Sequence, residues 1–177
     1  MNVTAPIALI AASYTSADDA MHDFRSVWAS RTDGEFHHTA LAVLTKDADG
    51  RLQVERSNST AKHLVWGGAL LGGALFVVAP PAGAEVLTAV GLSGAGAIIG
   101  HIRENADPDE LSAASDVLEL GTSALVVVLV NRRGDAVTAL LDEADQLSSV
   151  HMVWGDLEEE LAHDFSRIRA DAVSIAS

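Results

Sequence analysis

The stretch LVWGGALLGGALFVVAPPAGAEVLTAVGLSGAGAIIG, residues 64–100, carries one charged residue, Glu85, in a chain that is otherwise strongly acidic. A Pro-Pro pair divides it into two apolar arms, residues 64–79 and 86–100. Apolar runs of this length without a polar stripe predict helices that are hydrophobic on all sides. We therefore expect a helical hairpin that must be covered by a lipid bilayer or by other copies of the chain.

The glycines of this hairpin are spaced for close helix packing. Gly68 and Gly72 are four residues apart, as are Gly96 and Gly100, and small residues at that interval let two helix backbones approach closely. Trp66 stands at the head of the first arm, where an indole suits a membrane interface. These five residues are the predicted positions for homo-oligomerisation or membrane anchoring.

The glycines of the segment GLSGAGAIIG, residues 91–100, do not form a nucleotide loop. They fall at positions 91, 94, 96 and 100, which is not the G-x-G-x-x-G spacing, and the chain has no G-x-x-x-x-G-K-[ST] motif. A serine-hydrolase elbow is excluded as well, because Ala95 stands where G-x-S-x-G requires glycine. We assign no catalytic residue and no cofactor, which favours a non-enzymatic protein without deciding the point.

The flanks of the hairpin bear on its location. Each arm spans about 23 Å at 1.5 Å per residue, against about 30 Å for a hydrocarbon core. Arg56 and Lys62 precede the first arm, and His101 and Arg103 follow the second. Positive flanks are typical of the cytoplasmic side, so we expect association with the cell membrane from the cytoplasm, or otherwise a cytoplasmic oligomer.

Strands and helices alternate on both sides of the hairpin. Ser16 with Asp19 makes a capping box, a D-A-D-G turn joins two strands, and Asp107 with Pro108 opens a helix that Gly121 is placed to end. The valine-rich run at 123–131 predicts a central strand. The expected elements are strand 7–14, helix 15–30, strands 38–46 and 51–58, helix 108–120, strand 123–131, helix 135–147, strand 149–155 and helix 156–175.

This order predicts the fold class α+β. Without the hairpin, two strand–helix–strand units follow one another, which indicates a ferredoxin-like sandwich with an inserted apolar Gly-rich helical hairpin and a C-terminal amphipathic helix. The predicted organisation is a first half of the α+β domain at 1–60, the insert at 61–103, a second half at 104–155 and an acidic helix at 156–177.

The order and composition of the segments in residues 5–155 resemble those of a known family. VLTKDADGRLQVERSNSTAKHL is followed by WGGALLGGAL, GAGAIIGH and then GTSALVVVLV. This order is similar to the DUF1269 family of bacterial, largely actinobacterial, membrane proteins. The resemblance implies a small α+β domain bearing a glycine-rich hairpin, with no established activity, and the helix after residue 155 departs from it.

Charge and composition limit the partners. The formal net charge is −14, of which residues 104–177 contribute −12. Such an acidic surface repels nucleic acid, so we expect no nucleic-acid partner. The acidic run at 156–160 leaves open a basic partner protein. With no cysteine, disulfides and thiolate sites are excluded.

Two histidines bracket the hairpin. His63 and His101 could meet at its base, where Glu104 would complete a metal site, but they are weak candidates, and we interpret them as polar anchors with no metal assigned. The alternative to a membrane-associated, self-associating protein is a soluble homo-oligomer. It would bind a small apolar ligand, or act as an enzyme, in a pocket between the sheet and its helices.

Overall fold

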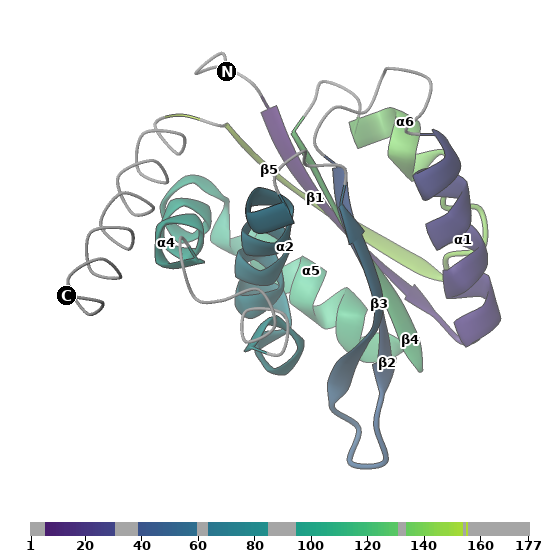
Figure 1. The fold of residues 1–177 in the computed structure, drawn as a ribbon. Coiled ribbons are helices and arrows are strands. Elements are labelled where there is room, and N and C mark those ends of the chain that lie inside the picture. Colours follow the sequence, from purple (N-terminus) through teal and green to yellow (C-terminus); the bar gives the residue numbers. More distant parts are fainter. Residues whose placement is uncertain are drawn as a thin grey trace, which may run out of the picture.

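The computed structural model describes residues 6–30, 39–59, 64–84, 95–130, 134–153 and 155. The predicted helix at 156–175, Trp154 and His63 lie outside these residues. The elements in chain order are β1 (Pro6–Tyr14), α1 (Ala17–Ser30), β2 (Thr39–Lys46), β3 (Leu52–Ser59), α2 (Leu64–Val78), α4 (Ala95–Asn105), α5 (Pro108–Leu120), β4 (Ser123–Val130), α6 (Gly134–Thr138) and β5 (Gln146–Val153) (Figure 1).

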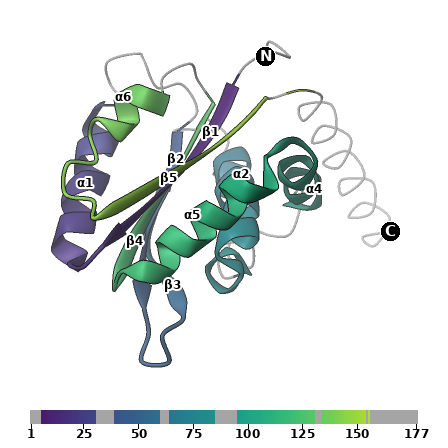
Figure 2. The same cartoon turned by 180° about the vertical axis from the view of Figure 1, so that it is seen from behind.

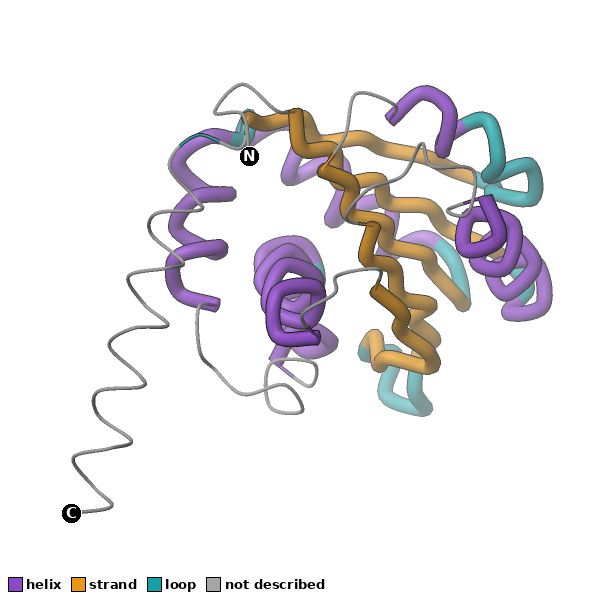
Figure 3. Tube along the Cα trace, turned by 45° about the horizontal axis from the view of Figure 1, so that its top comes forward, coloured by secondary structure: helices purple, strands orange, loops and turns teal. Residues whose placement is uncertain are grey.

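The described strands form one five-stranded sheet in the order β3-β2-β4-β1-β5, and every neighbouring pair is antiparallel (Figure 3). β1 and β2, joined through α1, are therefore parallel to each other with β4 between them. β4 and β5, joined through α6, are likewise parallel with β1 between them. Two strand–helix–strand crossovers thus interleave, and β3 extends the sheet as a hairpin beside β2. The predicted α+β class is confirmed at this level.

Helices cover both faces of the sheet (Figures 1 and 2). Ile7 and Leu9 of β1 pack in the cluster that contains α2, α4 and α5. Ala8 and Ile10 pack in the cluster that contains α1 and α6. Because alternate residues of a strand point to opposite faces, a strand covered on both sides becomes a continuous apolar run. This accounts for β1 and for β4, whose predicted central position is confirmed.

The helix starts follow the predicted capping signals. Ser16 Oγ accepts hydrogen bonds from the backbone N–H groups of Asp18 (3.2 Å) and Asp19 (3.4 Å) at the start of α1. Asp107 Oδ1 accepts from the N–H of Asp109 (2.8 Å), with Pro108 in the first turn of α5. Each cap satisfies donors that a helix N-terminus leaves unpaired.

Gly121 ends α5 as predicted, but for a different reason. Its φ of −91° is extended rather than left-handed, so any residue could adopt this backbone conformation. A Cβ at this position would overlap the carbonyl oxygen of Tyr14 and lie 2.8 Å from the Tyr14 nitrogen. The requirement for glycine is therefore the close approach of two chain segments.

Two helices end at other residues than the sequence predicted. The helix expected at 135–147 is wrong in length, because α6 ends at Thr138 and the chain then forms turns pinned to α1 and β1. Glu143 N–H donates to Asp23 Oδ2 (3.2 Å), and Asp145 N–H donates to the carbonyl of Ser13 (2.9 Å). The second arm of the hairpin was expected to end at residue 100, but α4 continues to Asn105.

Candidate functional site

The first glycine-rich arm, α2, packs on β2 and β4 of the sheet and contacts the helices α4 and α5 (Figure 1). Ala69, Leu70 and Leu71 are all buried, and successive residues of an α-helix point about 100° apart. All residues from 69 to 75, about two turns, are buried, so burial extends around the helix there, whereas Phe76 and Val77 are half-buried. A helix that is apolar on all sides is a core helix, and here the chain's own sheet and helices cover it. These residues need no cover from lipid or from other copies.

The predicted glycines of α2 are only partly described. Gly72 is buried within α2, whereas Gly68 and Trp66 lie in the same helix at positions whose side-chain surroundings are outside the description. The close approach to α2 comes from a residue that the sequence analysis did not single out. A Cβ on Gly83 would overlap the backbone nitrogen and Cα of Phe76 and lie 2.7 Å from the carbonyl carbon of Leu75. The signal that could have found it was the Pro-Pro-Ala-Gly turn directly after the helix.

The glycines of α4 have the opposite environment. Ile98 and Ile102 are buried against the core, while Gly96 is exposed and Gly100 is half-buried. A Cβ added to Gly96 or to Gly100 would meet nothing within 4 Å among the described residues. Close packing at these two glycines therefore does not occur within the described chain. α4 instead has one buried apolar face and one open glycine face.

His101 is a buried polar residue on α4, 6% exposed. Its Nε2 donates to the carbonyl oxygen of Val153 at the end of β5 (2.8 Å), and its Nδ1 accepts from Asn105 Nδ2 (3.3 Å). Both ring nitrogens are thus engaged, Nε2 as a donor and Nδ1 as an acceptor. His101 ties α4 to β5. In the described ranges, no group of three or more histidine or acidic side chains could hold a metal ion.

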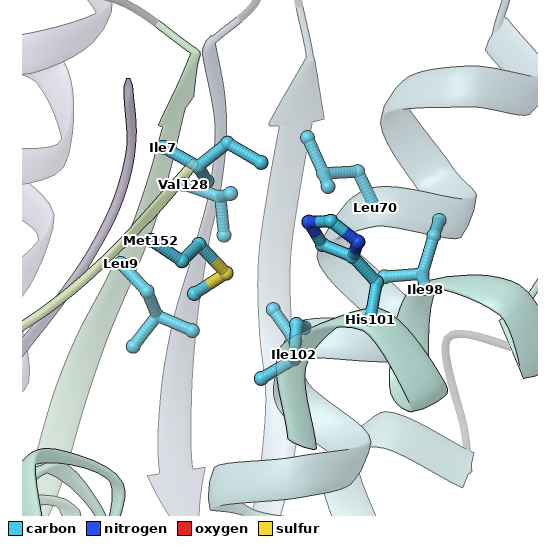
Figure 4. Close-up of a pocket in the computed structure, with 9 residues that line it drawn as sticks. Ile7, Leu9, Leu70, Ile98, His101, Ile102, Val128 and Met152 are labelled. Atoms are coloured by element: carbon cyan, nitrogen blue, oxygen red, sulfur yellow. The ribbon is translucent and has the colours of Figure 1, made fainter. Parts of the chain in front are cut away.

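A small cavity lies between the sheet and the helices α2 and α4 (Figure 4). Its lining is apolar except for His101, and includes Leu70 and Ile98 from the helices and Leu9 and Met152 from the strands. About 10 Å³ is open to the centre of a water molecule, which is the room needed by about one water. This cavity is too small for a metabolite, so it does not favour the ligand-binding alternative.

The opposite face of the sheet holds a buried acid that the sequence analysis missed. Asp23 on α1 is fully buried, and its Oδ2 accepts from the Tyr14 hydroxyl (3.0 Å) as well as from Glu143 N–H. Its Oδ1 has no hydrogen-bond partner among the residues that the structure describes. Burial raises the pKa of the Asp23 carboxyl, although the bonds from Tyr14 and Glu143 oppose this. Burial, followed by the charge of Asp23, raises the pKa of the Tyr14 phenol well above its ordinary value.

Comparison with protein-family models, with curated proteins and with solved structures finds no match to this chain. Among the described helices, none is both long and apolar enough to cross a membrane. The case for a function therefore rests on the open glycine face of α4 and on the contacts around it.

Proposed function

We propose that this chain is a non-enzymatic, self-associating α+β protein that assembles with further copies through α4. The observation that carries this proposal is the open face at Gly96 and Gly100, where added side chains would meet nothing in the described chain. Small residues four apart on an exposed helix face allow a second helix to approach closely. The apolar side of α4 is already used, since Ile98 and Ile102 pack in the core.

Assembly between copies is favoured here over anchoring in a bilayer. The strongest sequence argument for lipid was that the apolar surface of the first arm needs cover. In the structure β2, β4, α4 and α5 pack against this arm, α2, which weakens that argument. His101, expected as an interfacial anchor, bonds inward to Val153. What remains accessible is a small-residue face, which is suited to helix–helix contact. Anchoring at the cytoplasmic side of a membrane is the competing proposal.

We also propose that the fold is a ferredoxin-like core with an inserted glycine-rich unit. Four strands in the order β2-β4-β1-β5 and two crossover helices on one face, α1 and α6, support this. On this proposal α2 and α4 are the insert, and they cover the face that the crossover helices leave bare. Membership of the DUF1269 family is likewise a proposal, and it rests on the residues quoted for it.

The test is the mass of the purified protein without detergent, measured by size-exclusion chromatography with light scattering. Gly96→Leu and Gly100→Leu should each shift the assembly toward monomer, because the new side chains fill the space that a second helix would occupy. The matched control is Ala113→Leu, a small exposed residue on the neighbouring helix α5, which should leave the mass unchanged. Equal masses for parent and both glycine variants would contradict the proposal.

A flotation assay with vesicles separates the membrane alternative. The parent protein should stay with the soluble fraction when mixed with vesicles of neutral and anionic phospholipid. Co-flotation that Gly96→Leu leaves intact would show that lipid, rather than another copy, covers the chain.

A further inference from the structure

The outer edge of β5 carries two polar contacts that replace a neighbouring strand. In the described part of the chain β5 pairs with β1 alone. On its other side, His151 N–H donates to Glu110 Oε2 (2.8 Å), and the Val153 carbonyl accepts from His101 Nε2 (2.8 Å). Backbone groups of a strand alternate in direction, so residues 147, 149, 151 and 153 present their N–H and C=O groups to this outer edge. Figure 2 shows β5 running across the front, between α5 and α1.

The same residues carry an exposed apolar pair. Leu147 is 40% and Val153 is 48% exposed, and with Leu120 of α5 they are the exposed large hydrophobic residues of the described chain. Val150 and Met152 point the other way and are buried under the helices. An edge strand with unpaired backbone groups and exposed apolar side chains is a template for strand addition.

This edge is self-complementary. A two-fold axis normal to the sheet and midway between the Val150 residues of two copies would place Leu147 of each copy opposite Val153 of the other. It would also place Ser149 of each copy opposite His151 of the other. The opposed residues would lie on the same face, and all four would direct their backbone groups across the junction, as an antiparallel ladder requires. A register centred one residue earlier would instead place Leu147 opposite His151. The position of the two apolar residues therefore selects both the partner and the register.

We propose that the β5 edges of two copies pair antiparallel about Val150, joining two five-stranded sheets, and that Glu110 holds this edge closed in the free chain. A carbonyl oxygen can accept two hydrogen bonds, so His101 can keep its bond to Val153 when a strand arrives. The His151 N–H donates to one acceptor, so the Glu110 carboxylate must leave. Its side chain is 39% exposed and can swing into solvent. This surface is distinct from the glycine face of α4.

The first test changes the competing carboxylate. Glu110→Ala should tighten dimerisation by about tenfold or more, since a hydrogen bond to a charged group no longer has to be exchanged. Asp116→Ala, which removes an exposed acid from the same helix, is the control and should leave the dissociation constant unchanged. Leu147→Lys should weaken dimerisation, whereas Leu120→Lys should not. An unchanged dissociation constant for Glu110→Ala, or a monomer at all concentrations, overturns the proposal.

The second test reads the register directly. The chain has no cysteine, so Leu147→Cys and Val153→Cys variants each carry one thiol. Opposed residues of a bonded pair lie about 5.5 Å apart, within disulfide range, whereas these two positions in one strand are about 20 Å apart. Mixing the two variants under mild oxidation should give the 147–153 link between copies, and neither variant alone should link as fast.

The proposals for the α4 surface and for the β5 edge can be refuted independently of each other. If Gly96→Leu abolishes assembly while the 147–153 link still forms, the β5 pairing stands independently of α4. If the cysteine at 147 links to itself as readily as to 153, the register is wrong, whatever the outcome for α4.

Discussion

Replacing Gly83 with alanine tests whether α2 is enclosed by its own chain. The added methyl group would overlap the backbone nitrogen and Cα of Phe76 and lie 2.7 Å from the carbonyl carbon of Leu75. Carbon atoms in contact prefer about 3.5–4.0 Å, and these atoms belong to the backbone of a buried helix, which cannot rotate aside. Overpacking typically costs 1–3 kcal/mol, and we expect about 3 kcal/mol of unfolding free energy to be lost.

The matched control is Gly100→Ala, which makes the same chemical change in α4. No described atom lies within 4 Å of the new methyl group, and the position is inside a helix. Alanine should therefore stabilise the monomer by about 0.5–1 kcal/mol, because glycine loses more backbone entropy on folding. The two substitutions should have opposite signs. Urea unfolding followed by far-ultraviolet circular dichroism, at a concentration where the protein is monomeric, measures both.

An unfolding free energy for Gly83→Ala within about 0.5 kcal/mol of the parent, the range of an ordinary surface substitution, would refute this reasoning. It would mean that the short helical segment at 80–84 does not pack on Phe76, and that α2 is less enclosed by its own chain. The apolar surface of α2 would then again require cover from lipid or from another copy.

Three further outcomes follow from single contacts. Because the folded pKa of Asp23 is raised, its proton stabilises the fold at low pH, and this stability is lost as the pH rises through the folded pKa. Asp23→Asn should therefore gain stability relative to the parent as the pH rises above the ordinary pKa of a carboxyl, and a difference that is independent of pH would contradict the burial of a titrating acid. Gly121→Ala should cost about 2–3 kcal/mol in urea unfolding through its overlap with Tyr14, and a neutral result would show that the two segments can separate. Asp107→Ala should cost about 1 kcal/mol by removing the cap on Asp109 N–H, whereas an unchanged midpoint would assign the start of α5 to Pro108 alone.

Elements with strong local signals could be predicted from the sequence. The valine run of β4, the turn between β2 and β3, and the caps at Ser16 and Asp107 each contain their own physical reason, and the structure has them where expected. The helical spacing at 135–147 was misleading, because Asp23 and Ser13 accept the backbone N–H groups of its second half. Those partners are more than a hundred residues away, so no local pattern could reveal them.

The candidate glycines illustrate the same limit. Gly96 and Gly100 have the spacing of a packing motif, but a Cβ at either would meet no described atom within 4 Å, whereas Gly83, outside any such motif, touches the backbone of α2. Spacing shows which residues share a helix face, but only the three-dimensional fold shows what lies opposite that face. The bonds of Glu110 and His101 to the edge of β5 are equally invisible in the sequence, since they join elements 41 and 52 residues apart.

The apolar residues of α2 that the structure describes are accounted for by the sheet they cover. β1 from Ile7 to Ala12 and β4 from Ala124 to Leu129 are apolar and buried at every successive residue, which requires cover on both faces of the sheet. The two crossover helices, α1 and α6, supply one face only. The other face needs a layer that is apolar toward the sheet, and its central helix, flanked on both sides, must be apolar all round. α2 meets this requirement, so its lack of charge is explained within one chain. On the two proposals above, contact with other copies uses surfaces that this layer leaves accessible among the described residues, which are the glycine face of α4 and the outer edge of β5.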